Sequence, residues 1–243
     1  MSPGFRLPIQ HQSYQYPPSH HPYFNKLKEQ EGLVFVDSET EKHRGHWRSL
    51  FPSASALDQR PLHVEIGCNA GHVIVEWAQA HPENLYLGID WKFKSIFRAA
   101  EKAKKRNLKN IVFLRAYAER LSSIFGENEL DSLCLFFPDP WAKNSQVKNR
   151  FFSPERLKQI ALVMKPTGLF HVKTDHREYF KSMLKITAEA SAQWNLLEMS
   201  MNLHEHHPDP QKLQIPEVTL FEKIFIRENL PIHSMKLRPK NSS

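Results

Sequence analysis

An aspartate held between two prolines is the feature of this chain best suited to chemistry. The segment Phe136–Lys143 reads Phe-Phe-Pro-Asp-Pro-Trp-Ala-Lys and follows an apolar run that begins at Leu130. Proline fixes its own φ and pushes the preceding residue toward extended backbone, so Pro138 and Pro140 restrain Asp139 from both sides. A carboxylate fixed at the end of a buried strand can position a substrate or stabilise charge that develops on it. The simpler alternative is a strand-terminating turn with an exposed acid.

A second group of candidate residues follows two earlier β-rich runs. The first run leads into Glu65-Ile-Gly-Cys-Asn-Ala-Gly71, where Gly67 and Gly71 let a ligand approach the backbone closely. The glycine spacing differs from the dinucleotide fingerprint, and the loop lacks the Lys-Ser/Thr of a P-loop. The second run ends at Asp90, which can accept hydrogen bonds from both hydroxyls of a ribose, although aspartate is also a common helix N-cap. The loop resembles the nucleoside-binding loop of class I methyltransferases, in which an acid precedes the first glycine.

Strands and helices must alternate to place these residues. Ser153 and Pro154 predict the start of one helix, as N-cap and first-turn residue. The alternation indicates an α/β fold with a doubly wound, mostly parallel sheet, and such sheets bind ligands at the carboxyl ends of their strands. The hydrophobic patterns predict strands over 32–36, 62–66, 85–90, 111–115, 130–137, 169–173, 195–203 and 218–227, and helices over 73–80, 93–106, 118–125, 154–164 and 178–191.

The bulk composition is that of a globular protein with one large domain. The chain has 243 residues, of which 40% are hydrophobic. Residues 1–30 are poor in apolar side chains and rich in turn formers, so we expect a loosely ordered N-terminal arm over 1–45 and the main domain over 46–243. No apolar run approaches the roughly 20 residues of a membrane helix. Two cysteines cannot form a disulfide framework, which favours a reducing, cytoplasmic location.

Positive charge is concentrated in a few segments of the chain. The net charge is +7 and the isoelectric point is about 9.3. The segment Lys92–Lys109 holds eight Lys and Arg residues and one acid, Glu101. Further basic residues cluster over 143–158 and 236–240. A charged run is often only a solvated helix face, but several clusters of one sign favour binding to a polyanion such as nucleic acid.

Five motifs, taken in order and spacing, resemble one family. They are Glu65-Ile-Gly67, Gly88-Ile-Asp90, Phe136–Lys143, Phe170–Asp175 and Thr219–Glu222. Over about residues 47–227 the chain is similar to the bacterial tRNA (guanine-N7-)-methyltransferases. The resemblance implies a Rossmann-like class I methyltransferase, for which we expect seven strands. It also implies methyl transfer from S-adenosylmethionine, without a metal, to N7 of a guanosine in tRNA, by resemblance the guanine of the variable loop.

The same resemblance assigns roles to individual residues. Tyr117 stands where related enzymes commonly have an acid for the adenine amino group. It can stack on adenine or donate through its hydroxyl, or it is a packed surface aromatic. Asn69 replaces a usual glycine, and Ser145 and Gln146 replace usual basic residues. The implied donor-site residues are Glu65, Gly67, Gly71, Asp90 and Tyr117, and the implied guanosine-site residues are Asp139, Lys143, Asp175, Thr219 and Glu222, with Asp139 as the principal catalytic residue.

The residues suit a reaction without a general base. Guanine N7 carries no proton, so catalysis should rest on positioning the partners and on carboxylates that stabilise positive charge on the base. Asp139 and Asp175 can also accept from the N1 and N2 protons of guanine. Trp141 can stack on a displaced base, or it is a core or lid residue. The histidines of the segment His204–His207 could be metal ligands. No second cluster of ligands supports a metal site, so we interpret the segment as a polar loop.

Other functions remain open at this point. A non-catalytic RNA-binding protein could keep the methyltransferase fold, an alternative suggested by Asn69, by Tyr117 and by the fewer basic residues around Ser145 and Gln146. Amino-methylases use an Asp/Asn-Pro-Pro-Tyr/Phe turn, and this chain has Asp139-Pro-Trp instead. A dehydrogenase has little support from the glycine spacing. The sequence leaves open whether the chain is a monomer or a homodimer.

Overall fold

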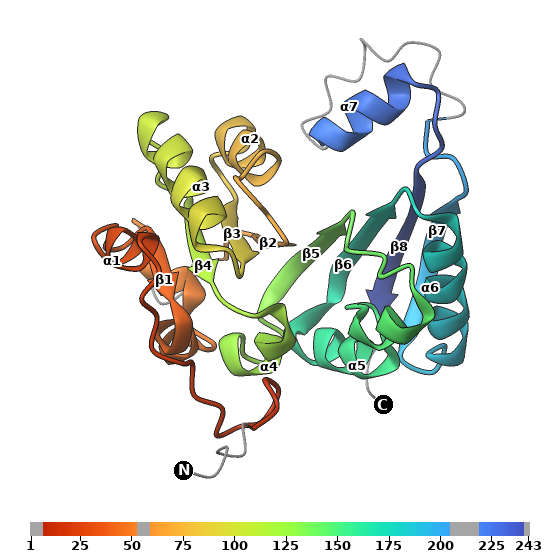
Figure 1. The fold of residues 1–243 in the computed structure, drawn as a ribbon, viewed down its shortest axis with the longest axis horizontal. Coiled ribbons are helices and arrows are strands. Elements are labelled where there is room, and N and C mark those ends of the chain that lie inside the picture. The colour runs from red at the N-terminus through yellow and green to blue at the C-terminus, as the bar shows by residue number, and fades with distance from the viewer. Residues whose placement is uncertain (1–6, 53–58, 205–218, 241–243) are drawn as a thin grey trace.

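An eight-stranded sheet forms the centre of the molecule, as the ribbon in Figure 1 shows. The computed structural model describes residues 7–52, 59–204 and 219–240. The strand order is β1-β4-β3-β2-β5-β6-β8-β7. Neighbouring strands are parallel, except that β8 runs antiparallel to β6 and β7. The strands are β1 (Val34–Val36), β2 (Leu62–Ile66), β3 (Leu85–Asp90), β4 (Ile111–Arg115), β5 (Leu130–Phe136), β6 (Met164–Thr174), β7 (Trp194–Ser200) and β8 (His233–Pro239).

The predicted doubly wound, mostly parallel sheet is confirmed, but the predicted number of seven strands is wrong. The short strand β1, which belongs to the predicted arm, pairs with β4 and lies at one edge of the sheet. The strand predicted over 218–227 is also wrong, because its described part forms the helix α7 (Leu220–Arg227). Thr219 and Glu222 form a reciprocal capping box there, with N–H to side-chain oxygen distances of 2.7 and 3.0 Å. This local signal starts a helix, and β8 supplies the last strand instead.

The other predicted helices lie close to their expected ranges. Ser153 caps α5 as predicted, since its Oγ accepts a hydrogen bond from the backbone N–H of Arg156 at 3.3 Å. No helix in the described part of the chain is long and apolar enough to cross a bilayer. The helices are α1 (Tyr23–Lys28), α2 (Ile74–Ala80), α3 (Phe93–Lys105), α4 (Leu121–Ile124), α5 (Pro154–Val163) and α6 (Arg177–Glu189), with 3₁₀ turns η1 (Asp37–His43), η2 (Trp47–Leu50), η3 (Ala118–Arg120) and η4 (Asn144–Asn149).

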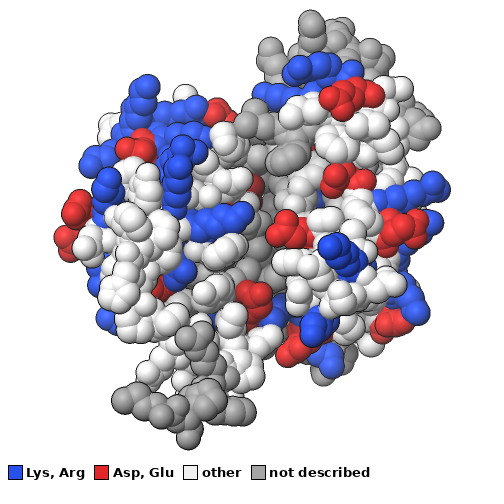
Figure 2. Space-filling view, in the orientation of Figure 1, with Lys and Arg blue, Asp and Glu red and all other residues white. Residues whose placement is uncertain are grey.

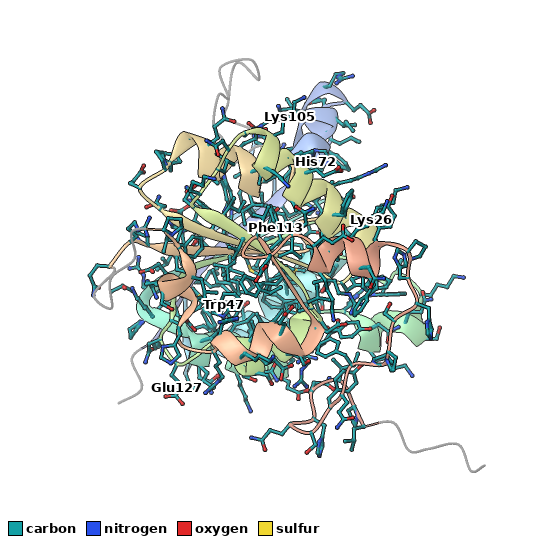
Figure 3. All side chains as sticks on the ribbon, turned by 90° about the vertical axis from the view of Figure 1, so that its left-hand side faces the viewer. Lys26, Trp47, His72, Lys105, Phe113 and Glu127 are labelled. Carbon is teal, nitrogen blue, oxygen red and sulfur yellow. The ribbon has the colours of Figure 1, made fainter. Side chains whose placement is uncertain are left out.

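Two layers of helices cover the sheet. Helices α1, α2 and α3 share one buried apolar cluster with the sheet, and Phe113 of β4 lies in it. Helices α4, α5 and α6 form a second cluster on the opposite face, together with Trp47. Figure 3 shows Phe113 beneath α3 at the centre of the molecule and Trp47 in the other layer. The two clusters hold the sheet rigidly between them, which fixes the positions of the loops at its carboxyl edge.

The described part of the N-terminal arm packs on the domain. Leu27 of α1 is fully buried, and α1 lies against α3. Further along the arm, the guanidinium of Arg120 donates to the backbone carbonyls of Ile9 and His11 at 2.6 and 3.0 Å. The arm therefore runs beside the ends of β3 and β4 (Figure 1), where donor-site residues were predicted.

Candidate functional site

The loop after β2 begins at a buried carboxylate. Glu65 is 5% exposed, and its Oε2 accepts a hydrogen bond from the N–H of Ile74, the first residue of α2, at 3.2 Å. Burial raises the pKa of Glu65 to about 8, with a further increase from the nearby charge of Asp90 and an opposing effect of the Ile74 N–H. Glu65 therefore links the end of β2 to α2, and its own carboxyl group is buried away from water.

Two glycines shape this loop for different physical reasons. Gly67 has φ of +74°, and a Cβ placed there would meet no atom within 4 Å, so open space lies above this position. Gly71 has φ of +66°, and a Cβ there would lie 2.9 Å from Val75 and 3.0 Å from Ala99. Both positions favour glycine for their backbone conformation. Gly71 is also required for the close approach of α2 and α3, whereas Gly67 leaves room for a ligand.

The structure explains how asparagine replaces a glycine at position 69. Asn69 adopts φ of +48°, which asparagine accepts more readily than most residues. Its side-chain oxygen accepts a hydrogen bond from Ser95 of α3 at 3.1 Å. Its backbone N–H donates to Asp90 Oδ2 at 3.0 Å. The side chain is therefore part of the loop's own hydrogen-bond network, and the substitution preserves the loop.

Asp90 lies at the end of β3 and joins this loop to α3. Its Oδ1 accepts a hydrogen bond from the backbone N–H of Lys92 at 2.8 Å, and its Oδ2 accepts from Asn69. Burial raises the pKa of Asp90, although these two N–H groups act in the opposite direction. A carboxylate has about four lone-pair positions. Asp90 therefore keeps acceptor capacity for ligand hydroxyls after both backbone bonds are made.

Tyr117 lies just after β4, and its ring is covered on one side by the arm. The rings of Tyr117 and Tyr16 stack with centroids 5.6 Å apart and an interplanar angle of 6°. Tyr14 packs edge-on against Tyr117 at 6.4 Å. Arg115 places its guanidinium carbon 5.5 Å from the ring centroid of Tyr117. Tyr117 is therefore packed against the arm, and its predicted contact with adenine stays a prediction.

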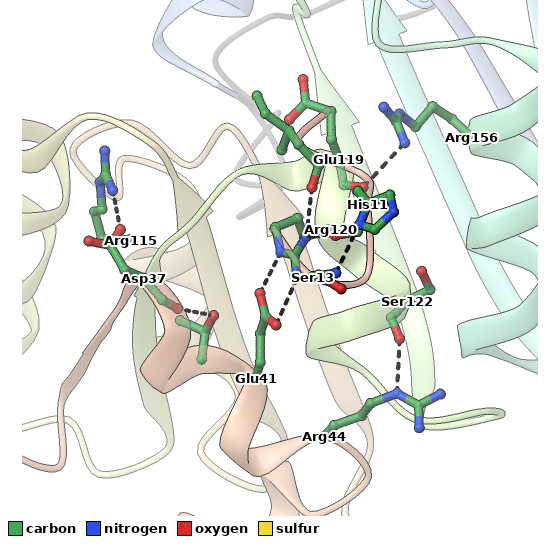
Figure 4. A network of polar contacts seen from close by, with 12 residues as sticks. His11, Ser13, Asp37, Glu41, Arg44, Arg115, Glu119, Arg120, Ser122 and Arg156 are labelled. Atoms are coloured by element: carbon green, nitrogen blue, oxygen red, sulfur yellow. Dashed lines mark hydrogen bonds and ion pairs between the residues drawn. The ribbon is translucent and has the colours of Figure 1, made fainter. Parts of the chain in front are cut away.

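Two arginines that the sequence reading did not single out hold the arm in place, as Figure 4 shows. Arg120 is 1% exposed and makes a two-pronged ion pair with Glu41 as well as its bonds to the arm carbonyls. Arg115 pairs with Asp37 next to the end of β4. Arg115 is the last residue of β4 and Arg120 follows it by five residues, but no local sequence pattern indicates their partners in the arm.

Asp139 and Asp175, the two acids predicted for the guanosine site, follow neighbouring strands. Strands β5 and β6 are parallel, with Phe136 opposite Lys173. The N–H of Phe137 donates to the carbonyl of Lys173 at 2.8 Å, so the two chains leave the sheet together. Asp139 and Asp175 follow these ends within three residues and are both exposed. The structure therefore places both acids at one edge, as predicted from the sequence.

The loop around Asp139 is held in an unusual backbone conformation. Phe137 and Trp141 have φ of +52° and +41°, values that bulky residues adopt only at a cost of about 1–3 kcal/mol. The guanidinium of Arg150 donates to the carbonyl of Pro140 at 2.7 Å and fixes the far side of the loop. Lys143 follows in an exposed position before η4. Such local strain is typical of functional loops.

Thr219 and Glu222 lie on α7, not on a strand as predicted. Glu222 is fully buried, and its Oε1 is 3.0 Å from Lys173 Nζ and 3.3 Å from His204 Nε2. Burial by itself would raise the pKa of Glu222, but the bond from His204 and the charge of Lys173 outweigh it and lower that pKa. The Lys173–Glu222 ion pair attaches α7 to β6, and Lys173 lies two residues before Asp175. Lys173, a buried lysine near the end of β6, was not predicted to contribute to the site.

The sheet order brings the two groups of acids to one edge. Glu65 and Asp90 belong to β2 and β3, and Asp139 and Asp175 follow β5 and β6. The order β3-β2-β5-β6 is continuous and all four strands are parallel. The chain reverses its direction of winding between β2 and β5, and ligands of open α/β sheets bind at such a point. The four acids therefore lie along one edge of the sheet.

The basic residues of α3 differ in whether they bind other residues of the chain. Figure 2 shows Lys and Arg gathered over α3, at the upper left of the molecule. Within this cluster Lys102 donates to the carbonyl of Ala70, in the loop after β2, at 2.8 Å, and Arg106 pairs with Glu76 at 2.7 Å. Lys104 and Lys105 are exposed and project from the same helix. Part of this basic run is therefore structural, and part is available to a polyanion.

The described residues include no cluster of three or more side chains suited to a metal ion. His204 contacts Glu222 in the buried network below α7. The other residues of the histidine segment, 205–207, lie outside the described residues.

A doubly wound sheet with one antiparallel strand near its edge, a glycine loop after β2 and an acid at the end of β3 define the class I methyltransferases. Solved structures agree on the fold. They include the 16S rRNA methyltransferase KamB (TM-score 0.57, 19% identity, 85% of this chain and 94% of that chain). A 16S rRNA (adenine(1408)-N(1))-methyltransferase from Catenulisporales acidiphilia, solved with its cosubstrate SAM, gives a TM-score of 0.52 at 14% identity over 77% of this chain and 88% of that one.

Sequence comparisons narrow the class to a family. A family model described as "Putative methyltransferase" matches residues 59–235. The tRNA (guanine-N(7)-)-methyltransferase of Macrococcus caseolyticus is 32% identical over 75% of this chain and 82% of that protein. Those of Bacillus cytotoxicus (33%, 76% and 82%) and Bdellovibrio bacteriovorus (28%, 85% and 95%) are similar as well. The chain belongs to this family of tRNA (guanine-N(7)-)-methyltransferases, which are enzymes.

Proposed function

We propose that the protein transfers a methyl group from S-adenosylmethionine to N7 of a guanosine in tRNA, by family resemblance the variable-loop guanine, and forms 7-methylguanosine. The observation that supports this most strongly is the shared edge, where the strands that carry Glu65 and Asp90 are neighbours of the strands that precede Asp139 and Asp175. The names of the relatives agree with this reaction and give no support to a non-catalytic RNA-binding protein. The tRNA is the proposed partner, and the cytoplasm is the proposed location.

The proposed donor site uses the loop after β2 and the end of β3. The open space above Gly67 fits a nucleoside laid across the backbone. Asp90 would accept from the ribose hydroxyls through its remaining lone pairs, and Glu65 would hold the loop on α2. Tyr117, which stacks on Tyr16 of the arm, would contact the adenine through its ring or its hydroxyl. S-adenosylmethionine supplies an electrophilic methyl group on a sulfonium.

The proposed guanosine site uses the strained loop after β5. Asp139 and Asp175 would accept from the N1 and N2 protons of guanine, a pattern that adenine lacks. As positive charge passes to the purine ring, the same carboxylates would stabilise it. Guanine N7 has no proton to remove, so the residues act by orientation and electrostatics. Lys143 would contact a phosphate or a base edge, and Thr219 and Glu222 would support the site from α7, attached through Lys173.

Incubation with methyl-labelled donor and unmodified tRNA tests the proposal. We expect label in tRNA, and nucleoside analysis should find it as 7-methylguanosine. Labelled 1-methylguanosine or a methylated adenosine instead would reject the assigned position. Calorimetry with S-adenosylmethionine separates the enzyme from a binding protein, because a folded chain that binds tRNA but no donor at about 1 mM would contradict the proposal.

A further inference from the structure

The loop around Asp139 is closed by the side chain of Arg150. After Pro140 the chain leaves the end of β5 and forms the turn η4, which ends next to Arg150. Arg150 Nε donates to the carbonyl oxygen of Pro140 at 2.7 Å, across ten residues of sequence. The backbone of Arg150 is itself fixed, because its N–H donates to the carbonyl of Val147 at 3.1 Å. The residue next to Asp139 is therefore bonded to the end of a hydrogen-bonded turn.

The same guanidinium lies over the ring of Tyr179, in the first turn of α6. Its central carbon is 4.6 Å from the ring centroid, a distance at which a cation and an aromatic face attract each other. Tyr179 is fully buried, and its hydroxyl accepts a hydrogen bond from the N–H of Phe152 at 3.1 Å. The half-buried Arg150 therefore contacts both the loop after β5 and the helix that follows β6.

The first turn of α6 is fixed to the residues on either side of Asp175. The N–H of Tyr179 donates to His176 Nδ1 at 3.1 Å, and the N–H of His176 donates to Thr174 Oγ1 at 3.2 Å. Thr174 is the last residue of β6 and is fully buried. Asp175 therefore lies between two residues whose positions are set by hydrogen bonds, close in sequence to the ring that Arg150 contacts.

An electrostatic effect indicates that Asp139 is near this turn. Burial raises the pKa of Tyr179 to about 12. The N–H of Phe152 and the charge of Arg150 act in the opposite direction, whereas the charge of Asp139 raises this pKa further. The carboxylate of Asp139 is therefore close enough to act on a hydroxyl in the first turn of α6.

Arg150 differs from the other basic residues of the segment 143–150. Lys143 and Lys148 are exposed, as residues that meet a polyanion must be. Arg150 is half-buried, and its Nε and one face of its guanidinium are already bound by the protein itself. The sequence places all three in one basic cluster, and the structure gives Arg150 a different role.

We propose that Arg150 is a positioning residue for methyl transfer, which holds the loop of Asp139 against the first turn of α6 and so sets the separation of Asp139 and Asp175. This inference rests on the proposed function, in which both carboxylates bind one guanine. The positive φ angles of Phe137 and Trp141 make the loop costly to keep in one conformation, so a fixed Asp139 requires a contact from outside. A displacement of about 1 Å can lower a rate by about 10²-fold.

Fluorine nuclear magnetic resonance tests the hold on the loop without any reaction. The chain has five tryptophans, and Trp141→Phe identifies the signal of Trp141, the residue after Pro140, in protein labelled with fluorotryptophan. Arg150→Ala should shift or broaden this signal. Arg44→Ala is the matched control and should leave the signal in place, because Arg44 is exposed and its Nε also donates to a backbone carbonyl, that of Ser122, at 2.9 Å.

Steady-state kinetics and binding measurements test the role in catalysis. Folded Arg150→Ala should lower kcat by about 10- to 100-fold, while the affinities for tRNA and for S-adenosylmethionine stay within about two-fold. Arg44→Ala should keep the wild-type kcat. Arg150→Lys keeps the positive charge but lacks the planar guanidinium, so it should lose most of the turnover as well. It also serves as the second variant should Arg150→Ala fail to fold.

A contact with a phosphate of tRNA is the competing role, and the same measurements separate it. Loss of such a contact would weaken tRNA binding, reduce its salt slope by about one unit and be largely repaired in Arg150→Lys. That pattern, a wild-type kcat in folded Arg150→Ala, or an unchanged Trp141 signal in that variant would overturn the proposal. If the wild-type protein leaves guanine N7 unmethylated while the Trp141 signal responds to Arg150→Ala, the proposed function and the role in methyl transfer are rejected, but the hold of Arg150 on the loop stands.

Discussion

The donor and acceptor halves of the proposed site hold their carboxylates in opposite ways. On the donor side Glu65 and Asp90 are buried, accept bonds from backbone N–H groups, and have raised pKa values. On the acceptor side Asp139 and Asp175 are exposed, and Asp139 is fixed by the strained backbone and prolines around it. The donor side is shaped by packing of many residues, whereas the acceptor side depends on the conformation of one loop. Substitutions on the two sides should therefore change different measured quantities, donor affinity on one side and turnover on the other.

The largest expected effect is on turnover. Asp139→Ala should lower kcat by about 10²–10³-fold, because it removes a fixed charge that stabilises the developing cation. Donor affinity should stay within about two-fold, since the residue lies outside the donor loop. Steady-state kinetics on bulk tRNA and donor calorimetry measure the two quantities. Glu127→Ala, at an exposed position after α4, is the control, and wild-type turnover in Asp139→Ala would remove the residue from the mechanism.

The second effect is on donor binding. Asp90→Ala should weaken the affinity for S-adenosylmethionine by about 10- to 100-fold, because bonds to a charged acceptor contribute about 1.5–3 kcal/mol each. Asp90→Asn keeps the shape of the side chain and should lose less. Equilibrium calorimetry gives both values, and thermal unfolding checks that each variant is folded. Unchanged donor affinity in folded Asp90→Ala would contradict the comparison of the two halves.

A third prediction concerns pH and the buried acid of the donor side. The pKa of Glu65 is raised from 4.5 to about 8 in the folded protein, so the folded chain binds more protons than the unfolded chain between these values. The free energy of unfolding should therefore fall as pH rises from about 4.5 to 8. Glu65→Gln removes this contribution and should show a shallower fall in thermal stability. Equal slopes for the two proteins would contradict the raised pKa.

The smallest effect is expected on the basic surface. Lys104→Ala with Lys105→Ala should reduce the salt dependence of tRNA binding by about one unit of slope for each phosphate that the helix no longer neutralises. Lys102 is left unchanged because it bonds to the donor loop. Lys185→Ala, an exposed lysine on α6 in the other layer of helices, serves as the control. An unchanged slope would exclude the end of α3 from the tRNA footprint.

The sequence predicted best what depends on local pattern. The alternation of strands and helices, the cap at Ser153 and the loop glycines follow from neighbouring residues, and the structure shows them where expected. The apolar run after Thr219 was misread because such a run fits a strand or a helix, and only the capping box distinguishes them. Contacts between distant residues had no local signal: Arg120 bonds to the arm across 109 and 111 residues of sequence, and Lys173 bonds to Glu222 across 49.

The positive φ angles of Phe137 and Trp141 have a consequence for protein engineering. A screen that selects for heat resistance alone should favour glycine at either position, because the relief of about 1–3 kcal/mol of backbone strain exceeds the about 0.4–1 kcal/mol that glycine costs through the entropy of the unfolded chain. The same replacement would also let the backbone between the two residues, which carries Asp139, adopt other conformations. Thermostable variants of this enzyme obtained in that way should therefore have slower turnover. Stability and activity would then be opposed at these two residues.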